Sequence, residues 1–207
     1  MHRLVVVDDH PIVFHAIRDA LPRAGFRIVA ECRDAPSALV AIRTHAPDTI
    51  VLDLHLPGGG VTLLQRLRAA GSRVRVLMLS GDEERVGGLR ALRAGADGYL
   101  PKSAPITDLT MAIELVARGK RCFRPIVTDG VPSADANDDA LLGSLSDREF
   151  NVLKGVAEGR SNGEIALELA LTPKSVSACR NKLMRKLSMP NVAALIAFAR
   201  ANHVTLD

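Results

Sequence analysis

The sequence has no tryptophan and only one tyrosine, and it has no long uninterrupted hydrophobic run. None of its apolar stretches approaches the ~20 residues of a membrane-spanning helix, so a membrane protein of that kind is excluded. Residues 1–4 lead into a short apolar run and then Asp8-Asp9, a pattern that is not that of a signal peptide. A chain of 207 residues is long enough for one large domain or two small ones.

Cysteine is also scarce. Cys32, Cys122 and Cys179 are widely spaced and form no CxxC pair, which argues against a disulfide framework or a zinc site. A reducing compartment, the cytoplasm, is therefore the expected location.

The net charge of +4 is unevenly distributed along the chain. Lys and Arg number 15 against 13 acids in residues 1–118, 3 against 4 in 119–143, and 9 against 6 in 144–207. No acid lies between Glu168 and Asp207. This asymmetry indicates a polyanionic partner for the C-terminal part.

Residues 1–118 alternate short apolar runs with amphipathic segments. Five strands are predicted at about 4–7, 27–32, 49–53, 74–79 and 98–100, each followed by a helix of period 3.6. The run 49–53 is apolar throughout until it reaches Asp53, as expected of a fully buried parallel strand. This order predicts an α/β fold: a doubly wound, five-stranded parallel sheet of flavodoxin-like order 2-1-3-4-5.

Polar residues stand where the predicted strands end. Asp8-Asp9 follow the first strand, Asp53 ends the third, and Ser80 and Lys102 follow the fourth and fifth. In a doubly wound sheet these residues emerge at one edge. Three converging carboxylates repel one another unless a cation joins them, and Mg²⁺ suits such a site. A phosphoryl group on Asp53 could then be neutralised by the metal and Lys102 and hydrogen-bonded by Ser80.

The alternative is that the three aspartates are ordinary turn residues and that Lys102 is a solvated surface lysine. Any one of these residues alone fits that interpretation. Their joint placement at strand ends, in the right order, favours a site.

These residues lie in motifs that resemble the receiver domain of two-component response regulators. The motifs are VVVDDHP (5–11), IVLDLHLP (50–57), VLMLSG (76–81) and GADGYLPK (95–102). The resemblance implies that Asp53 accepts a phosphoryl group from a sensor histidine kinase or phosphotransfer protein. It also implies Mg²⁺ ligands at Asp8, Asp9, Asp53 and the backbone carbonyl of His55. Ser80 would be the switch hydroxyl, Tyr99 the aromatic switch, and Lys102 the phosphate-binding lysine.

Two features depart from the common receiver pattern. The loop from Pro57 to Gly60 is one residue shorter before its closing glycine. Pro101 precedes Lys102, fixes φ and restricts Leu100, which could alter the approach of Lys102 to a phosphate.

Residues 119–143 have little periodicity and many turn-forming residues, so a linker is predicted. Four helices are then predicted over 144–207. Ser146 with Glu149 and Ser161 with Glu164 fit capping boxes. Thr172-Pro173 opens a third helix, and Pro190 is expected to begin the fourth. The tight connection between the second and third helices predicts a helix-turn-helix domain.

The third of these helices has two distinct faces. Val176, Leu183 and Leu187, with Cys179, form one face and are expected in the core. The opposite face suits the major groove of DNA, and it consists of Lys174, Ser177, Ala178, Asn181 and Arg185. Arg180, Lys182 and Lys186 flank this face and could reach phosphates. A solvated basic helix is the alternative.

Residues 144–204 resemble the LuxR-type DNA-binding domain. The matching patterns are LSxRE, GxSNxEIA, the TPKSV start of the third helix and the closing KL. Cys179 stands where many members carry histidine. The last helix resembles the family's dimerisation helix, through Val192, Leu195, Ile196 and Ala199; intradomain packing is the alternative.

The two resemblances together imply a transcriptional response regulator that binds double-stranded DNA as a homodimer under control of Asp53, with RNA polymerase as a further partner. Two alternatives stay open: a DNA-binding regulator that works without phosphorylation, and a protein-interaction adaptor without DNA binding. An enzyme is the weakest interpretation, because no residues suggest a separate substrate pocket.

Overall fold

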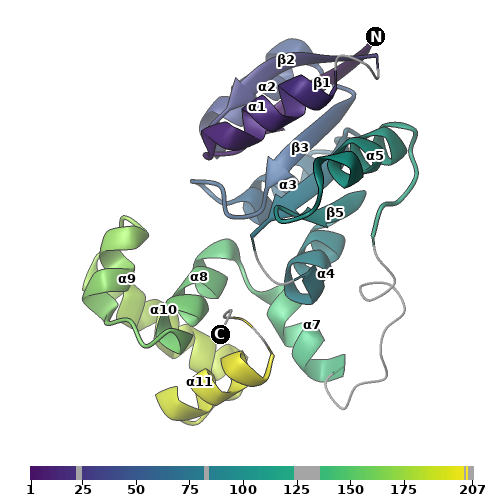
Figure 1. Cartoon of the computed structure of the whole chain (residues 1–207). Helices are drawn as coiled ribbons and strands as arrows, with labels where there is room; N and C mark the ends of the chain where they lie inside the picture. Colours follow the sequence, from purple (N-terminus) through teal and green to yellow (C-terminus); the bar gives the residue numbers. More distant parts are fainter. Residues whose placement is uncertain (22–24, 82–83, 124–135, 203, 205–207) are drawn as a thin grey trace. The chain divides into compact units, whose positions relative to one another are not determined.

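A computed structural model of the chain describes all residues except 22–24, 82–83, 124–135, 203 and 205–207 (Figure 1). The chain divides into two compact units, residues 1–129 and 130–207. In the described part of the chain, no helix is both long and apolar enough to cross a membrane.

The first unit is built on a five-stranded parallel sheet of order β2-β1-β3-β4-β5. This confirms the predicted α/β fold and strand order. The strands are β1 (His2–Val7), β2 (Phe26–Cys32), β3 (Thr49–Asp53), β4 (Arg75–Ser80) and β5 (Gly98–Pro101). Every residue of β3 is buried, as its apolar sequence indicates for a central strand covered on both faces.

Helices cover both faces of this sheet (Figure 1). They are α1 (Pro11–Ala20), α2 (Ala35–His45), α3 (Gly60–Ala69), α4 (Glu84–Ala94) and α5 (Ile106–Ala117). One hydrophobic cluster joins the sheet to α2, α3 and α4, and a second joins it to α1 and α5. The alternating directions of side chains along β3 supply both clusters: Ile50 and Leu52 enter the first, and Val51 enters the second.

The second unit is entirely helical in its described residues. Its helices are α7 (Ala136–Ser144), α8 (Asp147–Ala157), α9 (Asn162–Glu168), α10 (Pro173–Lys186) and α11 (Val192–Ala201). Both predicted capping boxes are present, at the starts of α8 and α9. Thr172 caps α10 by accepting a hydrogen bond from the backbone N–H of Ser175, with Pro173 at the first helical position.

Two boundaries differ from the prediction. Helix α7 covers the last part of the segment predicted as a linker and ends one residue beyond it. Leu142 on this helix is buried, although the segment has little apolar periodicity. The prediction that Pro190 begins the last helix was wrong. Asn191 is the N-cap of α11 instead, because its side chain accepts a hydrogen bond from the backbone N–H of Ala194 at 2.9 Å.

Candidate functional site

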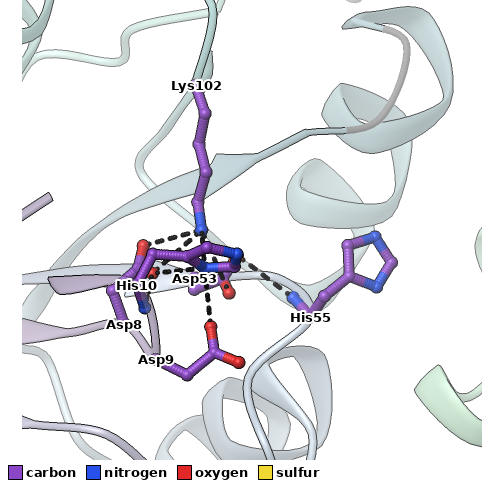
Figure 2. A network of polar contacts seen from close by, with 6 residues as sticks. All are labelled: Asp8, Asp9, His10, Asp53, His55 and Lys102. Carbon is purple, nitrogen blue, oxygen red and sulfur yellow. Dashed lines mark hydrogen bonds and ion pairs between the residues drawn. The ribbon is translucent and has the colours of Figure 1, made fainter. Parts of the chain in front are cut away.

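A cluster of charged residues lies at the carboxyl edge of the sheet (Figure 2). Asp8 follows β1, Asp53 ends β3, and Lys102 follows β5. The strand register aligns these ends, since Val7 pairs with Leu52 and Asp53 with Leu79. The structure therefore brings together the acids and the lysine that the sequence placed at strand ends.

The ammonium group of Lys102 joins the two buried acids. Its Nζ lies 2.8 Å from Asp8 Oδ2 and 3.2 Å from Asp53 Oδ2. The Lys102 backbone N–H also donates to the Ser80 carbonyl at 2.7 Å, which anchors the lysine beside β4. Pro101 therefore does not keep Lys102 away from the pocket, because the side chain spans the distance despite the fixed φ of its neighbour.

Asp53 is almost completely buried, with 1% of its surface exposed. Burial raises the pKa of its carboxyl, the ammonium of Lys102 opposes that rise, and the neighbouring Asp8 adds to it. The backbone N–H of His55 donates to Asp53 Oδ1 at 3.3 Å and also lowers the pKa, but the net direction is upward. A second source of positive charge would therefore stabilise the ionised carboxylate.

The donor atoms of this pocket suit a hard cation. Candidate ligand atoms of Asp8, Asp9, His10 and Asp53 all lie within 4.8 Å of one another. Asp8 Oδ2 and Asp53 Oδ2 are buried and share a single ammonium group, that of Lys102. Buried carboxylates that share one positive charge fit Mg²⁺, which binds one or two carboxylates and keeps several waters.

His10 is a member of the pocket that the sequence reasoning missed. Its Nδ1 lies 2.7 Å from Asp9 Oδ1, 3.1 Å from Asp8 Oδ1 and 3.2 Å from Lys102 Nζ (Figure 2). Its position directly after Asp8-Asp9 was the available signal. With 61% of its side chain exposed, it lies at the mouth of the pocket.

The glycine loop after β3 holds the phosphoacceptor candidate in place. Gly58 and Gly59 have φ values of 89° and 88°, a region that favours glycine. Gly60 begins α3, and a Cβ on it would lie 2.0 Å from the Asp53 carbonyl oxygen. Helix α3 can therefore approach the backbone of Asp53 only with glycine at position 60. The short loop, closed by Gly60, therefore allows α3 to pack directly against the Asp53 backbone.

The two predicted switch residues lie on neighbouring strands. Ser80 is fully buried at the end of β4. Tyr99 in β5 is 3% exposed and packs in the cluster under α2, α3 and α4. The structure therefore turns the Tyr99 ring inward, into the core.

Helix α10 carries the predicted DNA-binding face. Lys174, Ala178, Asn181 and Arg185 are exposed, whereas Val176 and Leu183 are buried, as the two-faced pattern indicates. Ser177 and Arg180 are half-buried. Arg180 donates to Asn162 Oδ1 at 3.3 Å, which links α10 to the start of α9.

The two lysines at the flank of α10 make an ion-pair network that was not predicted. Lys182 Nζ lies 2.8 Å from Glu149 Oε1, and Lys186 Nζ lies 2.9 Å from Glu149 Oε2. Burial alone would raise the pKa of Glu149, but hydrogen bonds from Lys182, the Ser146 backbone and Lys186 outweigh it and lower the pKa to about 2. Because 33 and 37 positions separate the partners, no local sequence pattern marks this network.

The residues predicted for dimerisation divide into two groups. Leu195 and Ala199 are fully buried, and α11 packs against α8 in the same unit. Val192 and Ile196 are only partly buried. Intradomain packing, the alternative considered for this helix, therefore describes Leu195 and Ala199.

A doubly wound sheet with an acidic pocket and a lysine at its carboxyl edge, followed by a capped helix-turn-helix, defines a class: a receiver domain joined to a DNA-binding domain. Comparison with known proteins agrees. Residues 4–114 match the response regulator receiver domain, and residues 143–199 match the bacterial regulatory proteins of the luxR family. The chain belongs to the response regulators that combine these two domains, which are DNA-binding transcriptional regulators and not enzymes.

Individual relatives cover nearly the whole chain. The Fimbriae Z protein of Salmonella typhimurium LT2 is 32% identical over 208 residues, covering 97% of each chain. The DNA-binding transcriptional activator EvgA of Escherichia coli K12 is 29% identical over 201 residues, covering 97% of this chain and 98% of its own. Among solved structures, the RcsB response regulator of Salmonella typhimurium matches over 100% of both chains, with a TM-score of 0.66 and 25% identity.

Proposed function

We propose that this protein is a phosphorylation-controlled transcriptional regulator in which Asp53 is the phosphoacceptor. The observation that supports this most is the position of Asp53: buried at the end of β3, beside Asp8 and within 3.2 Å of the Lys102 ammonium. An ordinary turn aspartate would be solvated and would have no reason to share a lysine with a second buried acid.

Each residue of the pocket would have a separate role in phosphoryl transfer. An Asp53 carboxylate oxygen attacks the phosphorus of a phosphohistidine on the donor protein, the P–O bond forms, and the P–N bond to the histidine breaks. Lys102 neutralises charge on the transferred group, and the Ser80 hydroxyl hydrogen-bonds to it. Tyr99, on the neighbouring strand β5, would be the element that responds.

Asp8, Asp9, Asp53 and the His55 backbone carbonyl would hold Mg²⁺. When bound, the ion would supply positive charge to the phosphoryl oxygens. The cluster of carboxylate oxygens within 4.8 Å of one another, two of them buried and sharing the one Lys102 ammonium, supports this assignment.

The second unit is proposed to bind double-stranded DNA. Asn181 would read a base edge, with Lys174, Ser177, Ala178 and Arg185 around it and Arg180 positioned by Asn162. Lys182 and Lys186 were predicted to reach phosphates. We propose that they also hold α10 against α8 through Glu149, which orients the recognition helix.

A homodimer would place two such helices about one DNA turn (~34 Å) apart. The partly exposed Val192 and Ile196 are the residues we propose for its contact. A sensor histidine kinase or phosphotransfer protein and RNA polymerase are the further proposed partners.

The phosphoacceptor assignment is tested with a small-molecule donor, so that no cognate kinase is needed. Wild-type protein incubated with acetyl phosphate and Mg²⁺ should gain one phosphoryl group by intact mass, and Asp53→Asn should gain none. Asp48→Asn is the matched control. Asp48 precedes the same strand and is half exposed, outside the pocket, so its variant should react like wild type. Equal phosphorylation of Asp53→Asn would refute the assignment.

DNA binding is tested separately by a gel shift on genomic fragments with a salt titration. Binding that falls steeply with salt and prefers particular fragments supports a DNA-binding regulator. Absence of binding at low salt would favour the adaptor interpretation.

A further inference from the structure

The ring of Tyr99 lies against a glycine in helix α4. Tyr99 belongs to β5, pairs with Met78 of β4 and lies in the same hydrophobic cluster as Ala91 and Ala94 of α4. A Cβ built on Gly87 would lie 2.3 Å from Tyr99 Oη, 2.7 Å from Cζ and 2.8 Å from Cε2. Carbon atoms in favourable contact are about 3.5–4.0 Å apart, so no other residue fits at position 87 while the ring is in this place.

The ring would have to move to make room for an added Cβ. Its hydroxyl would have to shift by roughly 1 Å to reach a van der Waals separation from that atom. Its core neighbours are fully or almost fully buried, which leaves little free space beside it. A side chain at position 87 would therefore displace the ring from its inward position.

Backbone conformation does not explain the glycine. Gly87 is not among the glycines with positive φ, and it lies inside α4, where glycine weakens a helix relative to alanine. What glycine provides there is the missing Cβ.

We propose that Gly87 is a positioning residue for Tyr99, the predicted aromatic switch. Because Gly87 has no Cβ, it leaves a slot in α4 that the Tyr99 ring occupies, and this contact couples the ring to the helix. This inference rests on the proposed function, in which Tyr99 responds to phosphorylation of Asp53. A side chain in this slot displaces the Tyr99 ring whether or not Asp53 is phosphorylated. Phosphorylation can then no longer act on α4 through the ring.

The composition of the chain makes the test unusually direct. Because Tyr99 is the only tyrosine and there is no tryptophan, intrinsic fluorescence reports on this ring alone. In the full-length wild-type protein acrylamide should quench this fluorescence weakly, since the ring is 3% exposed. In Gly87→Ala the Stern–Volmer constant should rise several-fold, both with and without acetyl phosphate and Mg²⁺.

Gly163→Ala is the matched control. Gly163 also lies in a helix. Apart from its chain neighbours and its own helix backbone, the described residues bring one atom within 4 Å of its added Cβ, Ser161 Oγ at 3.8 Å. Acrylamide should quench the fluorescence of this variant to the same extent as that of wild type. Quenching of Gly87→Ala equal to that of wild type would overturn the proposal.

A double-mutant comparison covers the case in which Gly87→Ala changes stability. In a Tyr99→Ala background the slot is empty, so Gly87→Ala should raise the thermal midpoint through helix propensity. In the Tyr99 background the same change should lower it. Equal shifts in both backgrounds would also overturn the proposal.

Failure of the proposed function has a different signature. In that case intact mass would show no phosphoryl group on wild-type Asp53. Acrylamide would still quench the Tyr99 fluorescence of Gly87→Ala more strongly than that of wild type.

Discussion

Replacing Glu149 by glutamine should loosen recognition helix α10 from α8 while keeping the cap of α8. A glutamine at this position can still accept a hydrogen bond from the Ser146 backbone N–H, as Glu149 does at 3.0 Å. What is lost is the charge that holds Lys182 and Lys186. The variant therefore isolates the ion pairs from the capping box.

The magnitude follows from the pKa of Glu149. A fall from 4.5 to about 2 corresponds to about 3 kcal/mol at neutral pH. Because 66% of the Lys182 side chain is exposed, solvent screening reduces the expected loss to about 1–2 kcal/mol. Since folding lowers this pKa, the stabilisation is present above pH 4.5 and is lost as the pH falls through about 2. The difference in free energy of unfolding between the variant and wild type should therefore shrink as the pH falls from 4.5 to about 2.

Hydrogen exchange measured by mass spectrometry resolves the effect within the full-length protein. Amides of α8 and α10 should exchange about 5- to 30-fold faster in Glu149→Gln at pH 7. Peptides from β1 and β3 serve as the internal reference. Glu168→Gln is the control variant, because that 56% exposed acid pairs with Arg160 at the surface and should change little. Unchanged exchange in α10 would refute the reasoning.

Three further outcomes follow from the site. Gly60→Ala places a Cβ against the Asp53 carbonyl, so urea denaturation should show that the free energy of unfolding falls by about 1–3 kcal/mol. Acetyl phosphate should also label this variant more slowly. Wild-type values in both measurements would contradict the packing argument. Folding raises the pKa of Asp53, so the ionised form destabilises the fold as pH rises above 3.8. Asp53→Asn should therefore be more stable than wild type at pH 7 but not well below pH 3.8. Mg²⁺ at ten times its Kd for wild type should stabilise wild type by about 1.4 kcal/mol, and the variant by less because it lacks one carboxylate ligand. Asn181→Ala should relax base preference in a binding-site selection, whereas Lys182→Ala should weaken all sites alike. Equal losses for Asn181→Ala on specific and random DNA would exclude base reading.

Much of this architecture could be predicted because its signals are local. The buried run 49–53, the aspartates that end strands and the two capping boxes each depend on neighbouring residues. The strand order follows from short right-handed connections, which leave few topologies for five alternating units.

The parts that escaped prediction depend on residues distant in sequence or on competition between nearby signals. The pairing of Glu149 with Lys182 and Lys186 is created only when α8 and α10 pack together. The contact between Gly87 and Tyr99 likewise requires α4 to be placed over β5, although a glycine inside a helical pattern was a visible signal. At α11, both Pro190 and Asn191 suit a helix start, and the side-chain cap of Asn191 decided between them.

The central claim is that phosphorylation of Asp53 controls DNA binding. The most direct measurement is the affinity of the protein for a genomic fragment recovered from its own co-purifying DNA, with and without acetyl phosphate and Mg²⁺. The phosphodonor should tighten binding of wild type and of Asp48→Asn by about 5-fold or more and leave Asp53→Asn unchanged. An equal response of Asp53→Asn and wild type, or no response in wild type that has been phosphorylated, would contradict it.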